Sequence, residues 1–406
     1  MVKTTAMSDS DASIHPRRVL FPLGLGTALS LMGDGTLYTV LPTHTADAGI
    51  ALSGVGIILG VNRAVRLFLN GPAGLAYDRW PRRRLFVPAL FIGALSTAVY
   101  AATRGFWPLL AGRLLWGLAW SGIWVGGATV ILDVTTGQDR GRWTGLYQTW
   151  FFLGAALSTF AGGLLTDWLG YGTTMWVGAG VTALGGVMAL ILLPETRGLH
   201  QQDDPPLEDS FPQLHANRGL WVATLLQGLN RFVTAGVLAA TMGLLAQDWL
   251  ASASLSLGVA TLTGVLMAGR TLLSVIAAPL AGTASDWMGS RWGVAACGLA
   301  VGAIGMALVA WGEPFAILAG VLLAAVAGGS VQALVTALTG DVVSQAQRGR
   351  AIGLLHTAGD LGSAIGPPAA YALMPWIELR GAYLLCAGLF AAGLATTLLL
   401  RPRVQG

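Results

Sequence analysis

The amino-acid sequence predicts an all-α membrane protein with 12 transmembrane helices, built as two pseudo-symmetric six-helix bundles. The first reason is composition: 54% of the residues are hydrophobic and only 10% are charged, whereas about 25% are charged in an ordinary soluble domain. The second is that apolar stretches recur along nearly the whole chain, each long enough to cross a hydrocarbon core that needs about 20 helical residues. The third is an internal repeat. These features argue against a soluble fold, which would need twelve buried helices with almost no exposed surface.

The repeat relates the two halves of the chain by an offset of 208 residues. Residues 133–154 align with residues 341–362 without a gap, and this alignment pairs Asp133 with Asp341. The same offset holds for further pairs, which are Gly74 with Gly282 and Asp78 with Asp286. A fixed spacing across separate landmarks indicates that one membrane unit was duplicated, and duplicated halves are typical of secondary transporters.

The first six helices are expected in an N-terminal domain of residues 1–196. Each is an apolar stretch, and those longer than 25 residues are expected to tilt or to extend beyond the bilayer. The chain's 57 glycines suit membrane helices that pack backbone to backbone. The expected spans are 19–41, 51–77, 84–103, 106–132, 143–166 and 173–193.

A polar segment then separates the two halves. Residues 197–218 are rich in acidic and polar side chains and include Pro205 and Pro206. This composition predicts a flexible cytoplasmic linker, with a binding role as the alternative.

The last six helices are expected in a C-terminal domain of residues 219–406. Their expected spans are 219–246, 255–285, 292–311, 314–340, 350–374 and 380–400.

The basic residues predict the orientation of these helices, because loops on the cytoplasmic side carry an excess of Lys and Arg. With a cytoplasmic N-terminus, sixteen basic residues lie inside and only Arg104 and Arg380 lie outside. Both termini are therefore expected in the cytoplasm, with the protein in a bacterial inner membrane. The net charge of +4 follows from this topology, and no nucleic-acid partner is expected.

Enzyme, metal and cofactor sites have no support in the sequence. The only lysine is Lys3, so a phosphate-binding GxxxxGK[ST] loop cannot exist, and no HExxH motif occurs. Cys297 and Cys386 lack metal-ligand spacing and sit in predicted membrane helices. We therefore expect no enzyme activity, no cofactor and no metal.

The loop after the second helix carries a recognisable motif. It runs from Gly74 through Asp78 and Arg79 to Arg82 and Arg83. It resembles the G-x-x-x-D-R-x-G-R-R loop of the major facilitator superfamily, although Pro81 stands where that family usually has glycine. A weaker second copy of this loop comprises Gly282, Asp286, Gly289 and Arg291. The predicted fourth helix also resembles the family's R-x-x-x-G element, with Arg113 and Gly117.

The resemblance covers about residues 18–400 and is nearest to the proton-coupled exporters of drugs and metabolites. It implies a fold of two six-helix bundles that rock around a central cavity. One departure concerns the Gly-Pro pair that many antiporters of the family carry in helix 5. Here that pair lies in helix 11, as Gly366-Pro367.

The motif loops are expected to form a gate at the cytoplasmic mouth. Asp78 would face the N-terminus of helix 11, where a carboxylate is favourable by roughly 0.3–1 kcal/mol, and Arg79, Arg82 and Asp133 would complete the cluster with Gly74. This gate would hold the inside closed and break when the halves rock. Asp286 and Arg291 are the second copy. For Arg83 and Arg84 the positive-inside rule is explanation enough.

Seven ionisable residues lie within the predicted helices, where each costs about 2.5–3.5 kcal/mol at the helix centre. They are Asp34, Arg63, Arg66, Arg113, Arg231, Arg270 and Asp360. Arg66 and Asp360 both lie about 15–16 Å from the cytoplasmic end at 1.5 Å per residue, on helices that meet across the two halves in the family fold. We predict an interdomain Arg66–Asp360 pair. Asp34 matches Arg63 in depth, or it bridges both Arg63 and Arg66.

The proton site is expected at Asp34, aided by Arg113. Asp34 lies between two glycines on a helix that lines the central cavity in this family. Desolvation and a nearby arginine act on a carboxyl group in opposite directions, so conformation or substrate could switch its protonation. A static ion pair is the alternative, and Asp360 is a second candidate.

The substrate cavity is expected to contain polar and aromatic side chains from both halves. For each of them, packing within the helix bundle is the alternative explanation. The candidates are Tyr38, Arg63, Arg113, Gln148, Asn230, Arg231, Arg270, Gln332 and His356.

The hypothesis that unites these features is a monomeric secondary active transporter that exports a small organic molecule in exchange for protons by alternating access. The alternatives are proton symport or facilitated transport of an organic anion, which three unpaired arginines favour, the flipping of a lysolipid or glycolipid, and a receptor without flux.

Overall fold

The computed structural model describes residues 14–136, 139–198, 217–252, 257–344 and 347–400, and within these ranges it is helical without strands. Most of the expected linker lies outside the described residues. The N-terminal half contains α1 Pro16–Val40, α2 Thr45–Ala48, α3 Leu52–Arg79, α4 Arg82–Ala102, α5 Phe106–Asp133, α6 Arg140–Leu169 and α7 Tyr171–Leu192. The C-terminal half contains α9 Arg218–Arg231, η1 Phe232–Leu238, α10 Ala239–Ser252, α11 Val259–Trp287, α12 Arg291–Trp311, α13 Pro314–Val342 and α14 Arg348–Leu400.

Ten of the described helical stretches are long and apolar enough to cross a membrane. One of them is the 53-residue α14, which is divided by the non-helical backbone of Glu378. With that division, and with the 25 residues of α1, the described chain provides twelve membrane-length segments. The all-α, twelve-helix fold predicted from the sequence is therefore confirmed.

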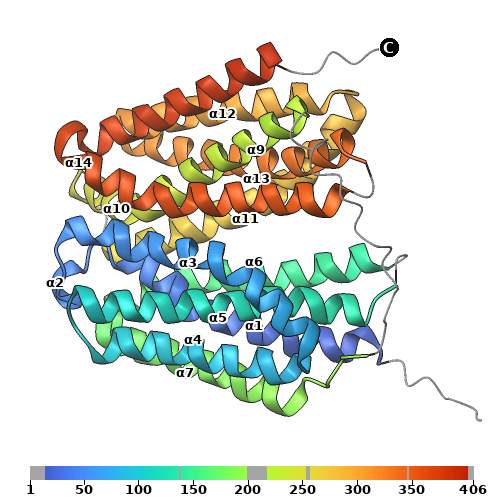
Figure 1. The fold of residues 1–406 in the computed structure, drawn as a ribbon. Coiled ribbons are helices and arrows are strands. Elements are labelled where there is room, and N and C mark those ends of the chain that lie inside the picture. The colour runs from blue at the N-terminus through green and yellow to red at the C-terminus, as the bar shows by residue number, and fades with distance from the viewer. Residues whose placement is uncertain (1–13, 137–138, 199–216, 253–256, 345–346, 401–406) are drawn as a thin grey trace, which may run out of the picture.

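The two halves form two adjacent bundles (Figure 1). Within the N-terminal bundle α1 packs against α6 and α7, and α4 packs against α5 and α7. Between the bundles α3 packs against α14 and α6 packs against α11. We call the end where α1 begins, α7 ends and α9 begins the terminal end, and the opposite end the α2 end.

The short turns at the α2 end show how far the duplication extends. The chain turns from α6 into α7 at Gly170, with φ 80° and ψ 164°, a region that is open essentially to glycine alone. The equivalent turn inside α14, 208 residues later, has φ 57° and ψ 177° at Glu378. The backbone turn has been kept although the side chain that favours it has not.

The first helix of each half departs from the offset of 208. Gly154 of α6 packs against Ala28, whereas Gly362, which is its equivalent in α14, packs against Gly228. The first helices are thus matched at an offset of 200 residues in this region, because the chain between the first helix and the later ones is longer in the second half.

The π-helix η1 shifts that register by one residue. Towards the end of η1, Gly236 lies against Gly366, as Gly35 lies against Ser158 in the first half, so the offset becomes 201. A π turn accommodates one extra residue within a helix and is frequent at functional sites. The sequence did not predict this element.

The two bundles touch at the α2 end. A Cβ atom on Gly56 of α3 would lie 2.6 Å from the carbonyl oxygen of Pro367, and one on Gly163 of α6 would lie 2.1 Å from that of Ala260. These glycines permit helix contacts that no larger residue would allow.

At the terminal end the same four helices are apart. Among the described residues, nothing lies within 4 Å of a Cβ built on seven of their glycines towards this end, which are Gly71, Gly74, Gly141, Gly145, Gly282, Gly349 and Gly353. The structure is therefore closed between the bundles at the α2 end and open at the terminal end.

Candidate functional site

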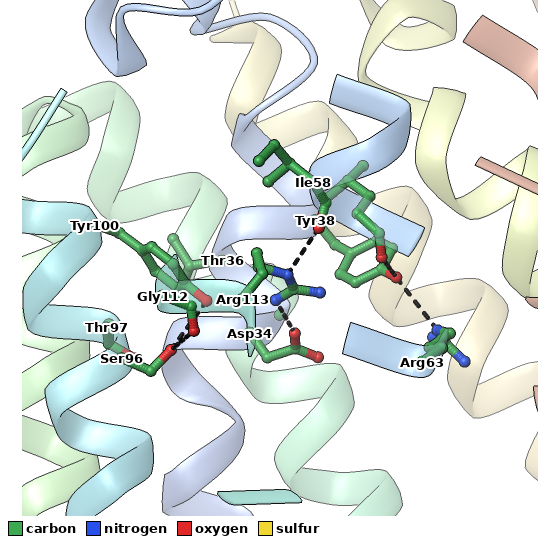
Figure 2. Close-up of polar contacts among 12 residues, drawn as sticks. Asp34, Thr36, Tyr38, Ile58, Arg63, Ser96, Thr97, Tyr100, Gly112 and Arg113 are labelled. Carbon is green, nitrogen blue, oxygen red and sulfur yellow. Dashed lines mark hydrogen bonds and ion pairs between the residues drawn. The ribbon is translucent and has the colours of Figure 1, made fainter. Parts of the chain in front are cut away.

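The most buried charged pair joins α1 to α5. Nη1 of Arg113 lies 2.5 Å from Oδ1 of Asp34, and Nε of Arg113 donates to the carbonyl oxygen of Ile58 at 3.0 Å (Figure 2). The Arg113 side chain is fully buried, whereas the Asp34 side chain is 18% exposed. Asp34 is thus the more accessible partner of this pair.

Two glycines explain why Asp34 sits in so crowded a place. A Cβ on Gly33 would lie 2.0 Å from Oγ1 of Thr97, and one on Gly35 would lie 2.0 Å from Oγ of Ser158. The Gly-Asp-Gly sequence lets α1 approach α4 and α6 on either side of Asp34, and this close packing fixes the carboxylate.

Tyr38 links this pair to a second arginine. Its hydroxyl donates to the carbonyl oxygen of Leu59 at 2.6 Å and accepts from Nε of Arg63 at 3.2 Å. Its ring also lies 5.6 Å from the guanidinium carbon of Arg63 and 5.4 Å from that of Arg113, within the range of a cation–π contact. Figure 2 shows the ring between the two guanidinium groups.

The expected pairing of Asp34 with Arg63, or with both Arg63 and Arg66, is therefore wrong. Asp34 pairs with Arg113, and Arg63 is bound by Tyr38, which lies one turn further along α1 on the same face as Asp34. Matching depths gave the level of these groups in the membrane but not the direction of each side chain.

The predicted contact between Arg66 and Asp360 is confirmed. Nη2 of Arg66 donates to both carboxylate oxygens at 3.1 Å, and the two side chains are 14% and 13% exposed. This pair joins α3 of the N-terminal half to α14 of the C-terminal half. Its part in gating stays a prediction.

The two arginines predicted inside the membrane in the C-terminal half, Arg231 and Arg270, have no carboxylate partner among the described residues. Arg231 ends α9 directly before the π turn, and no hydrogen bond is recorded there for its side chain. Nη1 of Arg270 donates at 2.5 Å to the carbonyl oxygen of Thr234, which lies in that turn. Both guanidinium groups are therefore positively charged without a neutralising neighbour of their own.

The remaining cavity candidates differ in their surroundings. Nδ2 of the buried Asn230 donates to the carbonyl oxygen of Gly328 at 3.1 Å, which fits the packing alternative. Gln332 is half-buried, and Gln148 and His356, which are equivalent at the offset of 208, are both exposed. Binding roles for these residues stay predictions.

The motif loop of the N-terminal half is only partly assembled. Nε of Arg82 lies 2.8 Å from Oδ2 of Asp133, and Thr196 also donates to that carboxylate, at 2.9 Å. Asp78 and Arg79 are exposed, and no side-chain partner is recorded for either in the described chain. The expected contact of Asp78 with the N-terminus of helix 11, which is the start of α14, is absent from this open state because the bundles are apart at this end.

The second copy of the motif forms its own pairs. Arg291 is paired with Asp341 and lies 3.6 Å from Asp286. An ion pair thus joins two successive membrane helices in each half. Arg82–Asp133 joins the start of α4 to the end of α5, and Arg291–Asp341 joins the start of α12 to the end of α13.

One contact between the halves was missed from the sequence. Oδ2 of Asp167, at the end of α6, accepts from the backbone N–H of Thr261 at 2.6 Å and from its hydroxyl at 2.5 Å. Asp167 therefore caps the first turn of α11 from the other bundle. The only signal in the sequence is an acidic residue at the end of an apolar span.

Comparison with known proteins gives the family. The sequence profile described as Major Facilitator Superfamily matches residues 23–214 and 220–406. The chain belongs to this superfamily. The fold and the family are those of membrane transporters and not of enzymes.

Known members of the superfamily match parts of the sequence. The chain is 34% identical over 145 residues to the class C tetracycline resistance protein of Escherichia coli, covering 34% of this chain and 36% of that protein. It is 32% identical over 119 residues to a probable 4-methylmuconolactone transporter of Cupriavidus pinatubonensis, covering 29% and 28%. The chain thus spans about a third of the length of the curated relatives that it matches.

Solved structures of the superfamily match nearly the whole fold. A bacterial homolog of the human lysosomal transporter Spinster, in an inward-facing and unoccupied conformation, superposes with a TM-score of 0.79 at 17% identity, covering 95% of this chain and 96% of that one. The human organic anion transporter MFSD10 gives a TM-score of 0.66 at 19% identity, covering 94% and 99%. At these identities the likeness concerns the fold.

Proposed function

We propose that this superfamily member is a secondary active transporter that exports a small organic molecule in exchange for protons by alternating access. It would act as a monomer in a bacterial inner membrane with both termini in the cytoplasm. The terminal end then faces the cytoplasm, and the state described above is inward-facing. The similarity to tetracycline resistance proteins supports export, and the excess of basic residues in the loops of the terminal end supports the orientation.

The Asp34–Arg113 pair carries the proposal of proton coupling. Protonation of Asp34 would leave the fully buried Arg113 without its counter-charge, and removing one partner from a buried pair costs roughly 3–5 kcal/mol. Such a cost couples the proton to another event, because a change in conformation or the arrival of substrate must offset it. The 18% exposure of the Asp34 side chain gives the proton a route to the site.

The transport cycle would use both ends of the interface between the bundles. In the outward-facing state the loops at the cytoplasmic mouth would close, with Asp78 at the start of α14 and with Arg79, Arg82 and Asp133 around it. Asp286 and Arg291 would act in the same way in the other half. Opening to the cytoplasm would replace these contacts by those at the α2 end, and the Arg66–Asp360 pair would act as the part of the gate that holds the inward-facing state.

The test is proton movement in inverted membrane vesicles that hold a respiration-driven pH gradient. Cationic, neutral and anionic compounds are added to vesicles with the wild-type protein, with Asp34→Asn, or with Asp47→Asn, which removes an exposed carboxylate at the α2 end as a matched control. We expect proton release that depends on one class of compound in the wild type and in the control, and none in Asp34→Asn. Unchanged release in Asp34→Asn contradicts the assigned proton site.

A further inference from the structure

The charges of the membrane helices do not balance. Of the seven ionisable residues expected there, five are arginines and two are aspartates. Both aspartates form ion pairs with arginines, Asp34 with Arg113 and Asp360 with Arg66. In the described part of these helices, three positive charges remain without a carboxylate of their own.

None of these three arginines is hydrogen-bonded to a carboxylate in the described chain. Arg63 donates to the Tyr38 hydroxyl and Arg270 to a backbone carbonyl, while the Arg231 side chain makes no recorded hydrogen bond within the described residues. Each guanidinium has five N–H donors and stays protonated in proteins, so the charge cannot be relieved by losing a proton. Hydrogen bonds to neutral oxygens leave most of these donors free.

The three guanidinium groups form one cluster that spans the two halves. Arg63 comes from α3, whereas Arg231 and Arg270 come from α9 and α11. Arg231 lies beside Gly359, where a Cβ atom would be 3.3 Å from the Cγ atom of Arg231, and the next residue, Asp360, is bound by Arg66, which follows Arg63 by one turn of α3. The like charges of Arg63, Arg231 and Arg270 therefore repel one another. Asp34 and Asp360 attract Arg63, and Asp360 attracts Arg231, but the Asp34 carboxylate is already bound by Arg113 and that of Asp360 by Arg66.

The π turn helps to build this cluster. It begins at the residue after Arg231, and the carbonyl oxygen of Thr234 within it receives the hydrogen bond from Arg270. The π turn therefore provides an anchor for Arg270 less than one turn from Arg231. The first half has no π turn among its described residues. At the offset of 200, its residue equivalent to Arg231 is Leu31.

We propose that Arg63, Arg231 and Arg270 form an oxyanion subsite and that the transported molecule is a small organic anion. Each arginine costs about 2.5–3.5 kcal/mol inside a membrane, and a bound carboxylate or phosphate ester offsets that cost through charge-assisted, bidentate hydrogen bonds. Because the subsite takes arginines from both bundles, the anion links them when it binds. This inference deepens the proposed function and rests on it. The subsite lies between the two bundles, where an alternating-access transporter would hold its substrate.

The experiment measures binding to the purified full-length protein in lipid nanodiscs by equilibrium dialysis of radiolabelled benzoate. Three competitors on the same ring separate the charge classes: phenyl phosphate, uncharged methyl benzoate and cationic benzylamine. The variants are Arg63→Gln, Arg231→Gln and Arg270→Gln, with Arg104→Gln, an exposed arginine at the α2 end, as the control. Thermal unfolding of each variant verifies that it is folded, and Arg→Lys at each site replaces any variant that is not.

We expect saturable benzoate binding that each cluster substitution weakens at least tenfold and that Arg104→Gln leaves unchanged. Phenyl phosphate should compete, whereas the ester and the amine should not, and the relative affinities of the two anions identify the preferred oxyanion. The inference is overturned if the folded wild type binds neither anion, if the ester or the amine competes equally well, or if all three variants bind as the wild type does.

The benzoate-binding experiment does not depend on proton coupling, because it is carried out without a pH gradient. Benzoate binding that persists in Asp34→Asn, together with a loss of proton release in vesicles, supports both proposals. Proton release that depends on a cation and on Asp34 supports the proposed function and overturns the anion subsite.

Discussion

The two halves of the molecule share their turns and loop ion pairs but not the charges in their membrane helices. Arg82–Asp133 in the first half has its counterpart in Arg291–Asp341. By contrast, the positions equivalent to the buried pair Asp34 and Arg113 are apolar in the second half, where they are Ala235 and Val321. The duplication thus preserved the scaffold and the loops, while each half acquired its own interior charges.

The same contrast applies to the two interfaces between the bundles. The α3–α14 interface holds Arg66 and Asp360, whereas the equivalent residues of the α11–α6 interface are Ser274 and Phe152. That second interface is fastened instead at the α2 end, where Asp167 caps α11. We infer that the two interfaces open differently, one against an ion pair within the membrane and the other against a helix cap at its edge.

The largest effect should come from making the first half resemble the second at its buried pair. Arg113→Met or Asp34→Leu alone leaves one buried charge unpaired and should lower the free energy of unfolding by roughly 3–5 kcal/mol. The double variant Asp34→Leu/Arg113→Met removes both charges and should recover most of that stability, as apolar residues suffice at the equivalent positions. Denaturant unfolding in detergent measures stability, and the vesicle assay should show no proton release from the double variant.

If the double variant is as unstable as the single ones, the pair is needed for the fold of this half and the analogy with the second half is wrong. Proton release by the double variant would remove the assigned role of Asp34.

A smaller effect is expected from making the two interfaces alike. Arg66→Gln/Asp360→Asn removes the ion pair from α3–α14 without leaving a single charge, and it should lower the stability of the inward-facing state by roughly 1–3 kcal/mol. The outward-facing population should then rise about tenfold. The reporter is Gly353→Cys on α14, which lies in open space in this state, labelled from the cytoplasmic side with an impermeant maleimide.

Labelling should be slower in the Arg66→Gln/Asp360→Asn background and unchanged in the Arg104→Gln background. Equal rates in all backgrounds would show that the ion pair is equally strong in both states and does not act in gating.

The turns at Gly170 and Glu378 offer a third comparison. Glu378 adopts a backbone conformation that costs a non-glycine residue about 1–3 kcal/mol, so Glu378→Gly should stabilise the protein by about 1 kcal/mol after the added flexibility of glycine is deducted. Gly170→Ala should destabilise it by a similar amount. Thermal unfolding of the two variants measures both effects, and a loss of stability in Glu378→Gly would indicate that the Glu378 side chain makes a contact that outweighs the strain.

The sequence predicted the fold well because composition and repetition act over long segments. The span 106–132 became α5 Phe106–Asp133, and 314–340 became α13 Pro314–Val342. The π turn could not be predicted in this way, because one extra residue changes neither the composition nor the length of a helix appreciably. The structure shows it as η1 and in the contacts of Gly228 and Gly236 with α14.

The site was predicted less completely for a physical reason. Depth along a helix follows from counting residues, and this was enough to pair Arg66 with Asp360. The direction of a side chain depends on how the helices are rotated against one another, so the partner of Asp34 was assigned wrongly. The cap at Asp167 joins residues whose proximity exists only after the bundles have met.

The smallest effect should come from that cap. Asp167→Ala removes the hydrogen bonds to Thr261 and should destabilise the contact between α6 and α11 by about 0.5–2 kcal/mol, the range for lost N-caps. Because the contact lies at the α2 end, the loss should favour outward opening and slow the labelling of Gly353→Cys, as the loss of Arg66–Asp360 does. The two changes lie in different interfaces, so their free energies should add. Labelling of the combined variant measures this, and an effect no larger than either change alone would show that the two interfaces open as one unit, contrary to the difference inferred between them.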